Sequence, residues 1–205
     1  MTSLSHPKLE RTFMMIKPDG VARGLTGDVL QRVERTGLRI AGLKMLRASK
    51  EHVSAFYPSD AAWIARVGSK TLATYEKFGY DAIAELGTKD PFQIGTQVRS
   101  WLMDFMTSGP VVPVVIQGVH AVAKVRKLAG ATMPTDAEFG TIRGDFSFDS
   151  AAAANRDKRA VFNVVHASET IEEAESEISH WFRPDELATY VTASELVMLP
   201  APPSR

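Results

Sequence analysis

The sequence predicts an α+β fold in which four antiparallel strands form one sheet and helices cover one face of it. Three observations lead to this prediction. Four short apolar runs have the length and composition of strands. Segments with helical apolar periodicity lie between the first and second runs and between the third and fourth. The order of elements is therefore βαββαβ, the split β-α-β arrangement.

The first half of this pattern holds two of the strands. Predicted strands are apolar runs bounded by turn residues, and predicted helices carry apolar residues three or four positions apart. The first strand is predicted at 12–16, and a turn follows at 17–20. A helix at 28–36 ends before Gly37, and a second strand follows at 38–46. Ser49 then caps a short helix that runs to residue 57. Val29, Leu30 and Val33 supply the apolar side of the longer helix.

The second half repeats the order of strand and helix. A third strand is predicted at 111–117, with Pro113 at an edge or a bulge, and a helix follows at 119–129 before Gly130. A fourth strand at 161–165 ends at His166. A helix then runs from a Thr170–Glu173 capping box to about residue 181, and a short helix follows with Pro184 in its first turn. This βαββαβ order predicts a ferredoxin-like antiparallel sheet.

Two segments lie outside this plan, and both are interpreted as insertions into a single domain that spans 1–205. Residues 58–100 form a helical insertion, with helical patterns at 61–79 and 80–86 and a turn at 89–91. Residues 147–160 form a polar, alanine-rich surface insertion. The tail at 200–205 is expected to be disordered.

Composition limits the classes of function. The chain has 205 residues, of which 44% are hydrophobic, enough for one substantial core. Because 24 basic and 24 acidic residues leave no net charge, nucleic acid is a disfavoured partner. The absence of cysteine excludes disulfides and thiolate metal sites. The N-terminus lacks an apolar signal core, and the longest apolar stretch, at 111–119, is too short to cross a bilayer, so we expect no membrane association and a soluble cytoplasmic protein.

His166 is the strongest candidate for a catalytic residue. It follows a predicted strand directly, at the edge of the sheet, where a ligand can reach the ring. Imidazole is a competent nucleophile near neutral pH, and it can accept a phosphoryl group and pass it on. An isolated histidine is more often structural, so the case for His166 depends on its neighbours.

Several cationic or hydroxyl side chains are expected near the same edge. Lys17 ends the first strand, Arg126 lies on the helix after the third strand, Thr132 follows that helix, and Arg143 lies beside Gly144. Phosphoryl transfer requires fixed positive charge around the phosphate oxygens. Arginine binds phosphate through a fork of donors, and lysine acts as a point charge. Together these residues predict a phosphate-binding site.

Two further residues are expected to orient the imidazole. Glu177 lies seven residues after Thr170, on a helix face that can turn towards His166, and Ser168 lies beside it in sequence. Their oxygens can fix the tautomer of the ring. Neither a P-loop nor a protein-kinase signature is present. No His or Cys metal cluster occurs, so any Mg²⁺ would arrive with nucleotide phosphates.

These motifs closely resemble the nucleoside diphosphate kinase family. The likeness runs from about Glu10 to about Tyr190, interrupted by the two insertions. The matching stretches are 10–13, 16–21, 23–25, 108–112, 140–146, 163–168 (NVVHAS) and 177–182. Asn-x-x-His-x-Ser alone is a weak signal, whereas the whole set in this order is highly specific.

The resemblance implies a ping-pong mechanism in which His166 is phosphorylated by a nucleoside triphosphate and then discharged by a nucleoside diphosphate. It implies that Lys17 and Asn163 hold the ribose hydroxyl and the phosphates, and that Tyr57 borders the site and supports Lys17. Arg126, Thr132 and Arg143 would bind phosphates, Glu177 would hydrogen-bond His166, and Ser168 would support Glu177. The family also implies Mg²⁺ bound to the phosphates and a homo-oligomer, a tetramer or hexamer built from dimers.

The sequence leaves more than one candidate for the residue that stacks on the nucleobase. The family usually has Arg-Pro-Phe-Phe before the Ser-Gly-Pro segment, and counting back from Ser108 places Val98 and Arg99 there. Phe92, in Asp90-Pro91-Phe92, is the alternative. Near the second insertion, Ala160 is the candidate for the other contact to the base.

Two other functions compete with an active nucleoside diphosphate kinase. One is a nucleotide-binding regulatory or scaffold protein on the same fold. The other is a histidine-dependent phosphotransferase with a non-nucleotide acceptor. The joint presence of His166, Lys17 and Glu177 favours the enzyme over a binding protein, because binding alone does not require the nucleophile.

Overall fold

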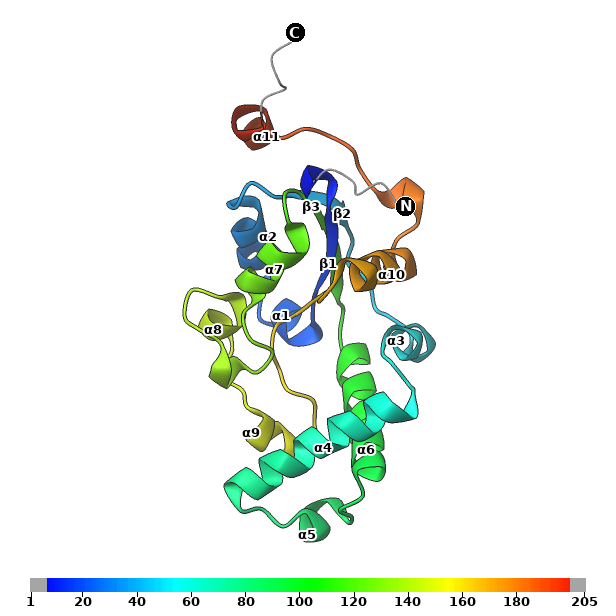
Figure 1. Ribbon diagram of the computed structural model, residues 1–205. Helices are drawn as coiled ribbons and strands as arrows, with labels where there is room; N and C mark the ends of the chain where they lie inside the picture. Colours follow the sequence, from blue (N-terminus) through cyan, green and yellow to red (C-terminus); the bar gives the residue numbers. More distant parts are fainter. Residues whose placement is uncertain (1–6, 200–205) are drawn as a thin grey trace.

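Four strands form a single antiparallel sheet (Figure 1). A computed structural model describes residues 7–199, and the predicted tail at 200–205 lies outside this range. The strands are β1 (Arg11–Ile16), β2 (Arg39–Leu43), β3 (Val112–Gln117) and β4 (Val165–Ala167), in the spatial order β2-β3-β1-β4. Both crossovers skip one strand, as in the split β-α-β arrangement, and the predicted fold class is confirmed.

Helices cover both faces of the sheet, so the expectation of one covered face is wrong (Figure 1). Along β1, Met14 and Ile16 pack on α2 (Thr26–Glu34) and α7 (Ala121–Ala129). Phe13 and Met15 pack on the opposite side, against α10 (Ile171–Trp181) and neighbouring helices. All four side chains are fully buried. A strand that is apolar on both sides needs a cover on each face.

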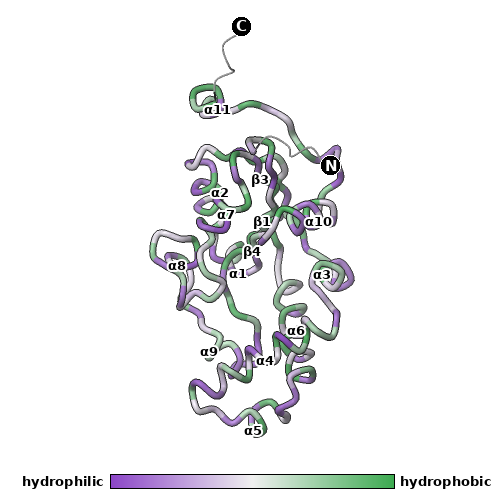
Figure 2. The backbone as a smooth tube through the Cα atoms, in the orientation of Figure 1, coloured by the Kyte–Doolittle hydropathy of each residue, from purple (hydrophilic) through white to green (hydrophobic). Residues whose placement is uncertain are grey.

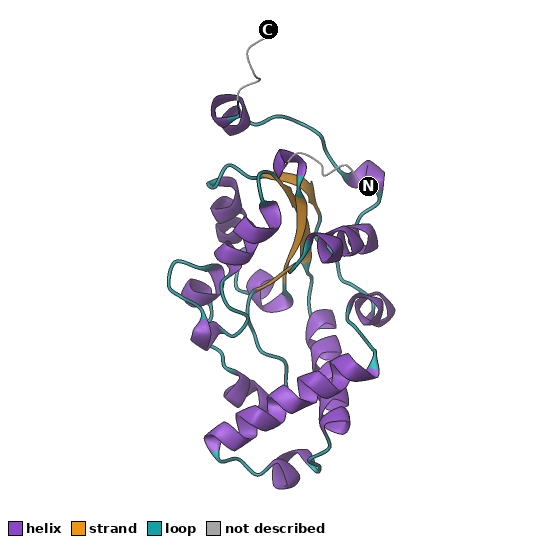
Figure 3. Cartoon of the chain, viewed as in Figure 1, coloured by secondary structure: helices purple, strands orange, loops and turns teal. Residues whose placement is uncertain are grey.

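The other half of the molecule is helical, as Figure 3 shows. It contains α4 (Ala61–Phe78), α5 (Ala82–Leu86) and α6 (Pro91–Thr107). The last of these crosses the predicted insertion boundary at residue 100, because Met103, Phe105 and Met106 continue into the core beside the sheet. The helical insertion therefore shares one continuous helix with the core.

Several short elements depart from the prediction. The fourth strand lies at Val165–Ala167 and not at 161–165, because Val164 has a positive φ of 65° that ends extended pairing. The predicted turn after β1 is the short helix α1 (Pro18–Ala22). Short elements without a periodic pattern were not predicted: α8 (Ile142–Phe146), α9 (Ala151–Arg156), α11 (Ala193–Met198) and the 3-10 turns Pro7–Leu9 and Pro134–Asp136. The short helix expected at Pro184 is the 3-10 turn Pro184–Glu186.

Residues 147–160 are not a purely exposed surface insertion, as the sequence suggested, because part of the segment packs against the rest of the protein. Within them α9 lies against α4, with Ala154 and Asn155 buried. Arg156 pairs with Glu85 at 3.3 Å and stacks over the ring of Tyr80. The two segments outside the βαββαβ plan thus contact each other.

Most helices are amphipathic, and their colours alternate between hydrophobic and hydrophilic along the tube in Figure 2. Their ends follow ordinary capping chemistry. Ser49 accepts the His52 amide at the start of α3 (Lys50–Phe56), and Thr170 accepts the Glu173 amide at the start of α10. Within the described part of the chain, no helix combines the length and apolar character needed to cross a bilayer.

Candidate active site

His166 lies in the middle of β4, opposite Met15 of β1. Its Nε2 is 2.7 Å from Oε1 of Glu177, on α10. The other carboxylate oxygen of Glu177 accepts the Ser168 hydroxyl at 2.6 Å. Because a carboxylate oxygen accepts and does not donate, Nε2 carries the proton in the neutral ring, and Nδ1 keeps its lone pair. The predicted contacts of His166, Ser168 and Glu177 are thus present.

Lys17 is buried at the end of β1, with 8% of its surface exposed. Its Nζ donates to Oδ1 of Asn163 at 2.7 Å. Burial, with a smaller contribution from the charge of Arg143, lowers the pKa of Lys17 to about 8, while Asp19 acts in the opposite direction. The lysine is therefore a cation whose charge depends on pH near neutrality.

Arg143, on α8, is also buried and holds three backbone carbonyls. It donates to the carbonyl oxygens of Asn163 at 3.3 Å, Gly130 at 2.7 Å and Val165 at 2.8 Å. Burial, and then repulsion from Arg126, lower the pKa of Arg143 to about 10. These hydrogen bonds hold the segment before His166 against the end of α7. Arg143 therefore stabilises the backbone of the site and also contributes positive charge to it.

A cavity of about 500 Å³ joins these groups. Most of the predicted site residues line it: Lys17, Tyr57, Arg126, Thr132, Arg143, Asn163, His166 and Glu177. Ser168 lies behind it, fully buried. Arg126 is 3.5 Å from Glu169, a largely exposed residue of the rim. The lining of the cavity therefore includes three cations and the imidazole.

Tyr57 is in the predicted place, but its predicted contact is not observed. Its hydroxyl is buried without a hydrogen-bond partner among the described residues. Burial and the nearby charge of Glu177 both raise the pKa of Tyr57. Lys17 is held by Asn163 instead.

The three candidates for base stacking do not line the cavity. Phe92 lies in the first turn of α6 and is 46% exposed. Val98 packs within the insertion. Arg99 donates to the carbonyl oxygens of Ser54 and Pro58, and so ties α6 to the end of α3. The structure does not bring these side chains together with the predicted site.

The aromatic rings that line the cavity are Phe56, Tyr57 and Trp63. The sequence interpretation missed Trp63, which lies in the first turn of α4 and donates its amide to the N-cap Asp60. The only signal was its position six residues after Tyr57, because the helical insertion breaks the register with the Arg-Pro-Phe-Phe pattern. Ala160 is buried in the core and does not line the cavity.

A possible metal site also lies here. His166, Glu173 and Glu177 form a group whose ligand atoms are within 4.8 Å of one another. Both oxygens of Glu177 are already engaged, one by His166 and one by Ser168. The chemistry of this trio therefore fits the orientation of the ring better than a resident metal ion.

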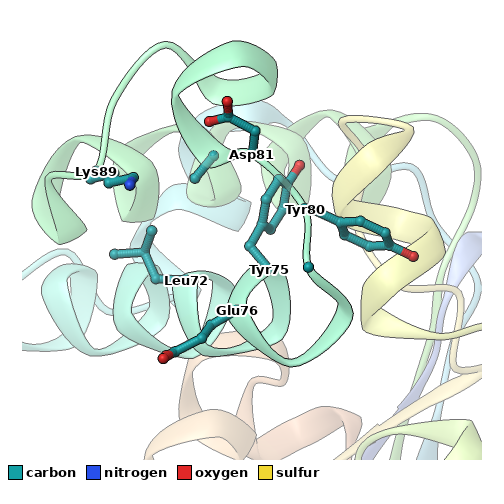
Figure 4. A pocket seen from close by; sticks show the side chains of 8 residues that line it. Leu72, Tyr75, Glu76, Tyr80, Asp81 and Lys89 are labelled. Carbon is teal, nitrogen blue, oxygen red and sulfur yellow. The ribbon is translucent and has the colours of Figure 1, made fainter.

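A second hollow, of about 530 Å³, lies within the helical insertion (Figure 4). Its polar groups serve local structure. The Tyr75 hydroxyl donates to Glu85, and Asp81 accepts the amides of Ile83 and Ala84 at the start of α5. In Figure 4 the charged ends of Glu76, Asp81 and Lys89 point in different directions. Because these groups do not converge, the hollow lacks the features of a reaction site.

A cavity lined by an imidazole and by Lys17, Arg126 and Arg143 has the chemistry of a phosphotransferase site. The chain belongs to the nucleoside diphosphate kinase family, whose sequence profile, described as "Nucleoside diphosphate kinase", matches residues 10–63 and 94–187. It is an enzyme that transfers a phosphoryl group from a nucleoside triphosphate to a nucleoside diphosphate. The gap in the match, 64–93, lies inside the helical insertion, while 147–160 lie within the second matched stretch.

Individual relatives agree over most of their length. The chain is 48% identical to a nucleoside diphosphate kinase of Pyrobaculum aerophilum, over 87% of this chain and 98% of that protein. It is 37% identical to human nucleoside diphosphate kinase B, over 89% and 91%. The crystal structure of an NDP kinase from P. aerophilum superposes with a TM-score of 0.85 at 46% identity, covering 88% of this chain and all of that one. A Borrelia burgdorferi nucleoside-diphosphate kinase with bound vanadate and ADP, described as a transition-state mimic, gives 0.71 at 34% identity, covering 94% and 98%.

Proposed function

We propose that Nδ1 of His166 is the nucleophile of a ping-pong nucleoside diphosphate kinase reaction. The observation that carries this proposal is the hydrogen bond from Nε2 to Glu177, which leaves Nδ1 as the nitrogen with a free lone pair. That lone pair forms the N–P bond to the γ-phosphorus while the bond to the bridging oxygen breaks. The nucleoside diphosphate leaves with the electron pair. A second diphosphate then takes the phosphoryl group by the reverse steps.

The residues around the cavity have complementary roles in this proposal. Lys17, Arg126 and Arg143 provide fixed positive charge for the phosphate oxygens, which is the main contribution a protein makes to phosphoryl transfer. Asn163 and Thr132 supply polar groups for the ribose and phosphates. Glu177 stabilises the imidazolium character that develops as the N–P bond forms, and Ser168 holds Glu177.

Mg²⁺ fits this site as a partner of the nucleotide. Magnesium prefers oxygen ligands and keeps several waters, so it binds through phosphates and one or two carboxylates. The carboxylates of Glu169 and Glu173 line the cavity on the exposed side. These two carboxylates would hold Mg²⁺, directly or through water, and the ion would neutralise phosphate charge during transfer.

We further propose that Trp63, and not Phe92, provides the stacking surface for the nucleobase. It is the one cavity-lining aromatic residue contributed by the helical insertion. Stacking on an aromatic face tolerates any base, because every base has a π-face. The insertion would thus affect nucleotide affinity more than the chemical step.

We also propose that the protein is a homo-oligomer built from dimers, as a tetramer or hexamer, and acts in the cytoplasm. The assembly is supported by the edge strand β2, which has β3 as its one sheet neighbour within the described residues. Leu43 on this strand and Met45 just after it expose much of their apolar surface. The chain's own C-terminal segment covers part of this edge, since the Ala188 amide donates to the Ala41 carbonyl oxygen. The exposed apolar side chains of Leu43 and Met45, more than free backbone groups, therefore suit this surface to contact with another chain.

The phosphoenzyme tests the proposed chemistry. After incubation with γ-labelled ATP, the protein should carry label that is labile in acid, stable in base and discharged by GDP. His166→Ala should abolish the label. His120→Asn is the matched control, because His120 is exposed, lies outside the cavity and has a positive φ that asparagine tolerates. Label retained in His166→Ala would refute the nucleophile, and label that GDP does not discharge would indicate a different acceptor.

A further inference from the structure

The motif Lys17-Pro18-Asp19-Gly20, which joins β1 to α1, contacts the two residues that precede β4. Lys17 donates through Nζ to the Asn163 side chain and through its backbone amide to the Val164 carbonyl oxygen, at 2.7 and 2.8 Å. Asp19 accepts the Val164 amide at 3.0 Å through Oδ2. Both backbone polar groups of Val164 are therefore bound by one motif far away in sequence.

Val164 requires such support because its backbone is strained. Its φ is +65°, and the Val165 amide donates to the Asn163 carbonyl oxygen at 2.7 Å, which closes a γ-turn around Val164. A β-branched residue rarely adopts this conformation, which persists only where neighbouring groups impose it. The turn sets the direction in which Asn163 and His166 leave the backbone on either side.

Asp19 also supplies negative charge close to Lys17. Its second oxygen, Oδ1, is buried and has no hydrogen-bond partner among the described residues. The ionisable groups that line the cavity with Lys17 come from several elements: Tyr57 after α3, Arg126 of α7, Arg143 of α8, His166 of β4, Glu169 after β4, and Glu173 and Glu177 of α10. Arg143 lowers the pKa of Lys17 and Asp19 raises it, with burial the dominant effect.

We propose that Asp19 is a positioning residue for phosphoryl transfer at His166: its carboxylate holds the strained turn at Val164 and provides negative charge beside Lys17. This inference depends on the proposed role of His166 as the nucleophile. Asp19 does not line the cavity, so it acts through Val164 and Lys17 and not on the nucleotide.

Two substitutions separate geometry from charge. Asp19→Ala removes both the acceptor for the Val164 amide and the charge. It should slow phosphorylation of His166 in a single turnover by about tenfold to a hundredfold, the range expected for a lost hydrogen bond to a charged group. Asp19→Asn keeps an oxygen that can accept from Val164 but removes the charge, so near neutral pH its rate should fall by less than about tenfold.

The pH profile of Asp19→Asn provides the readout that a purely structural role would not change. In the wild type, kcat/KM should fall as pH rises through the pKa of Lys17, about 8 in the free enzyme. Without the Asp19 charge the protonated lysine is less stable, so its pKa falls further. The basic limb of the profile should therefore move to lower pH.

Asp81→Asn is the matched control, because Asp81 accepts backbone amides at the start of α5, remote from the cavity. It should leave both the rate and the pH profile unchanged. A wild-type rate in folded Asp19→Ala, or an unshifted basic limb in Asp19→Asn, would overturn the inference. If Asp19→Ala does not fold, the pH profile of Asp19→Asn still tests the inference. His166→Ala, measured in parallel, tests the nucleophile itself and so separates the two proposals.

Discussion

The hydrogen bond from His166 to Glu177 determines which imidazole nitrogen is available for reaction. Glu177 is itself held by the Ser168 hydroxyl, whose oxygen accepts the Phe13 amide, while the Ser168 amide donates to the Phe13 carbonyl oxygen in β1. The ring is further confined by Phe13 and Phe56, whose centroids lie 6.0 and 5.2 Å from its own. The contacts that orient the His166 ring thus extend from helix α10 into the centre of the sheet.

Trp63 and Phe92 provide a direct comparison of two candidate stacking rings. Trp63→Ala should raise the KM for nucleoside diphosphates by about tenfold, the lower part of the range for loss of one base-stacking contact, and change kcat little. The increase should be similar for purine and pyrimidine substrates. Steady-state kinetics with GDP and CDP measure both.

Phe92→Ala is the control for this substitution, because Phe92 lies outside the cavity. It should leave KM unchanged. The reverse pattern, with a raised KM in Phe92→Ala and a normal one in Trp63→Ala, would restore Phe92 as the stacking residue.

The crossing of α4 and α6 places the insertion against the cavity. Gly68 of α4 lies on the backbone of Pro91, and Gly95 of α6 lies on the backbone of Ile64, so the two helices touch without side chains between them. A Cβ atom at either glycine would overlap a carbonyl oxygen of the other helix. Because α4 begins near Trp63 and α6 carries Leu102, this contact sets the spacing of two cavity walls.

Alanine at the crossing should therefore destabilise the protein. Gly68→Ala or Gly95→Ala should lower the free energy of unfolding by about 3 kcal/mol, the upper part of the range for overpacked sites. Gly79→Ala should cost only about 1 kcal/mol, since Gly79 has a positive φ but open space around its Cβ position. Chemical denaturation measures all three, and equal effects would contradict the proposed close contact.

The molecule consists of a core built on the β-sheet and a half made of helices. Helix α6 belongs to both, because its last residues pack in the core. Arg156 links α9 to the insertion through Glu85 and Tyr80, and Arg159 pairs with Asp149 at the base of the same excursion. Both links are partly exposed, so each adds modest stability. The segment after α9 leads to Asn163 and so connects the helical half to the cavity.

Assembly should be visible in solution. The 22.4 kDa chain should sediment as a tetramer or hexamer. Leu43→Asp, on the edge strand β2, should dissociate the assembly, because a buried unpaired charge opposes association. Phe78→Asp, on the equally exposed Phe78 of α4, is the control and should leave the mass unchanged. A monomeric wild type would refute the oligomer.

The sequence alone was sufficient for the order of the four strands, the fold class and membership of the nucleoside diphosphate kinase family. Apolar periodicity and helix caps depend on residues close together in the sequence, so a short stretch of sequence is enough to recognise them. Lys17, Arg126, Arg143, Asn163 and Glu177 were likewise recognisable, and the structure brings them to one cavity.

Only the tertiary structure decided features that depend on residues distant in the chain. The shift of β4 follows from the positive φ of Val164, which Lys17 and Asp19 hold from 145 or more residues away. Trp63 lines the cavity and Phe92 does not, an arrangement set by a helix crossing at two glycines. The lowered pKa of Lys17 follows from burial beside Arg143. Each of these arises from packing between distant segments, which local sequence patterns do not record.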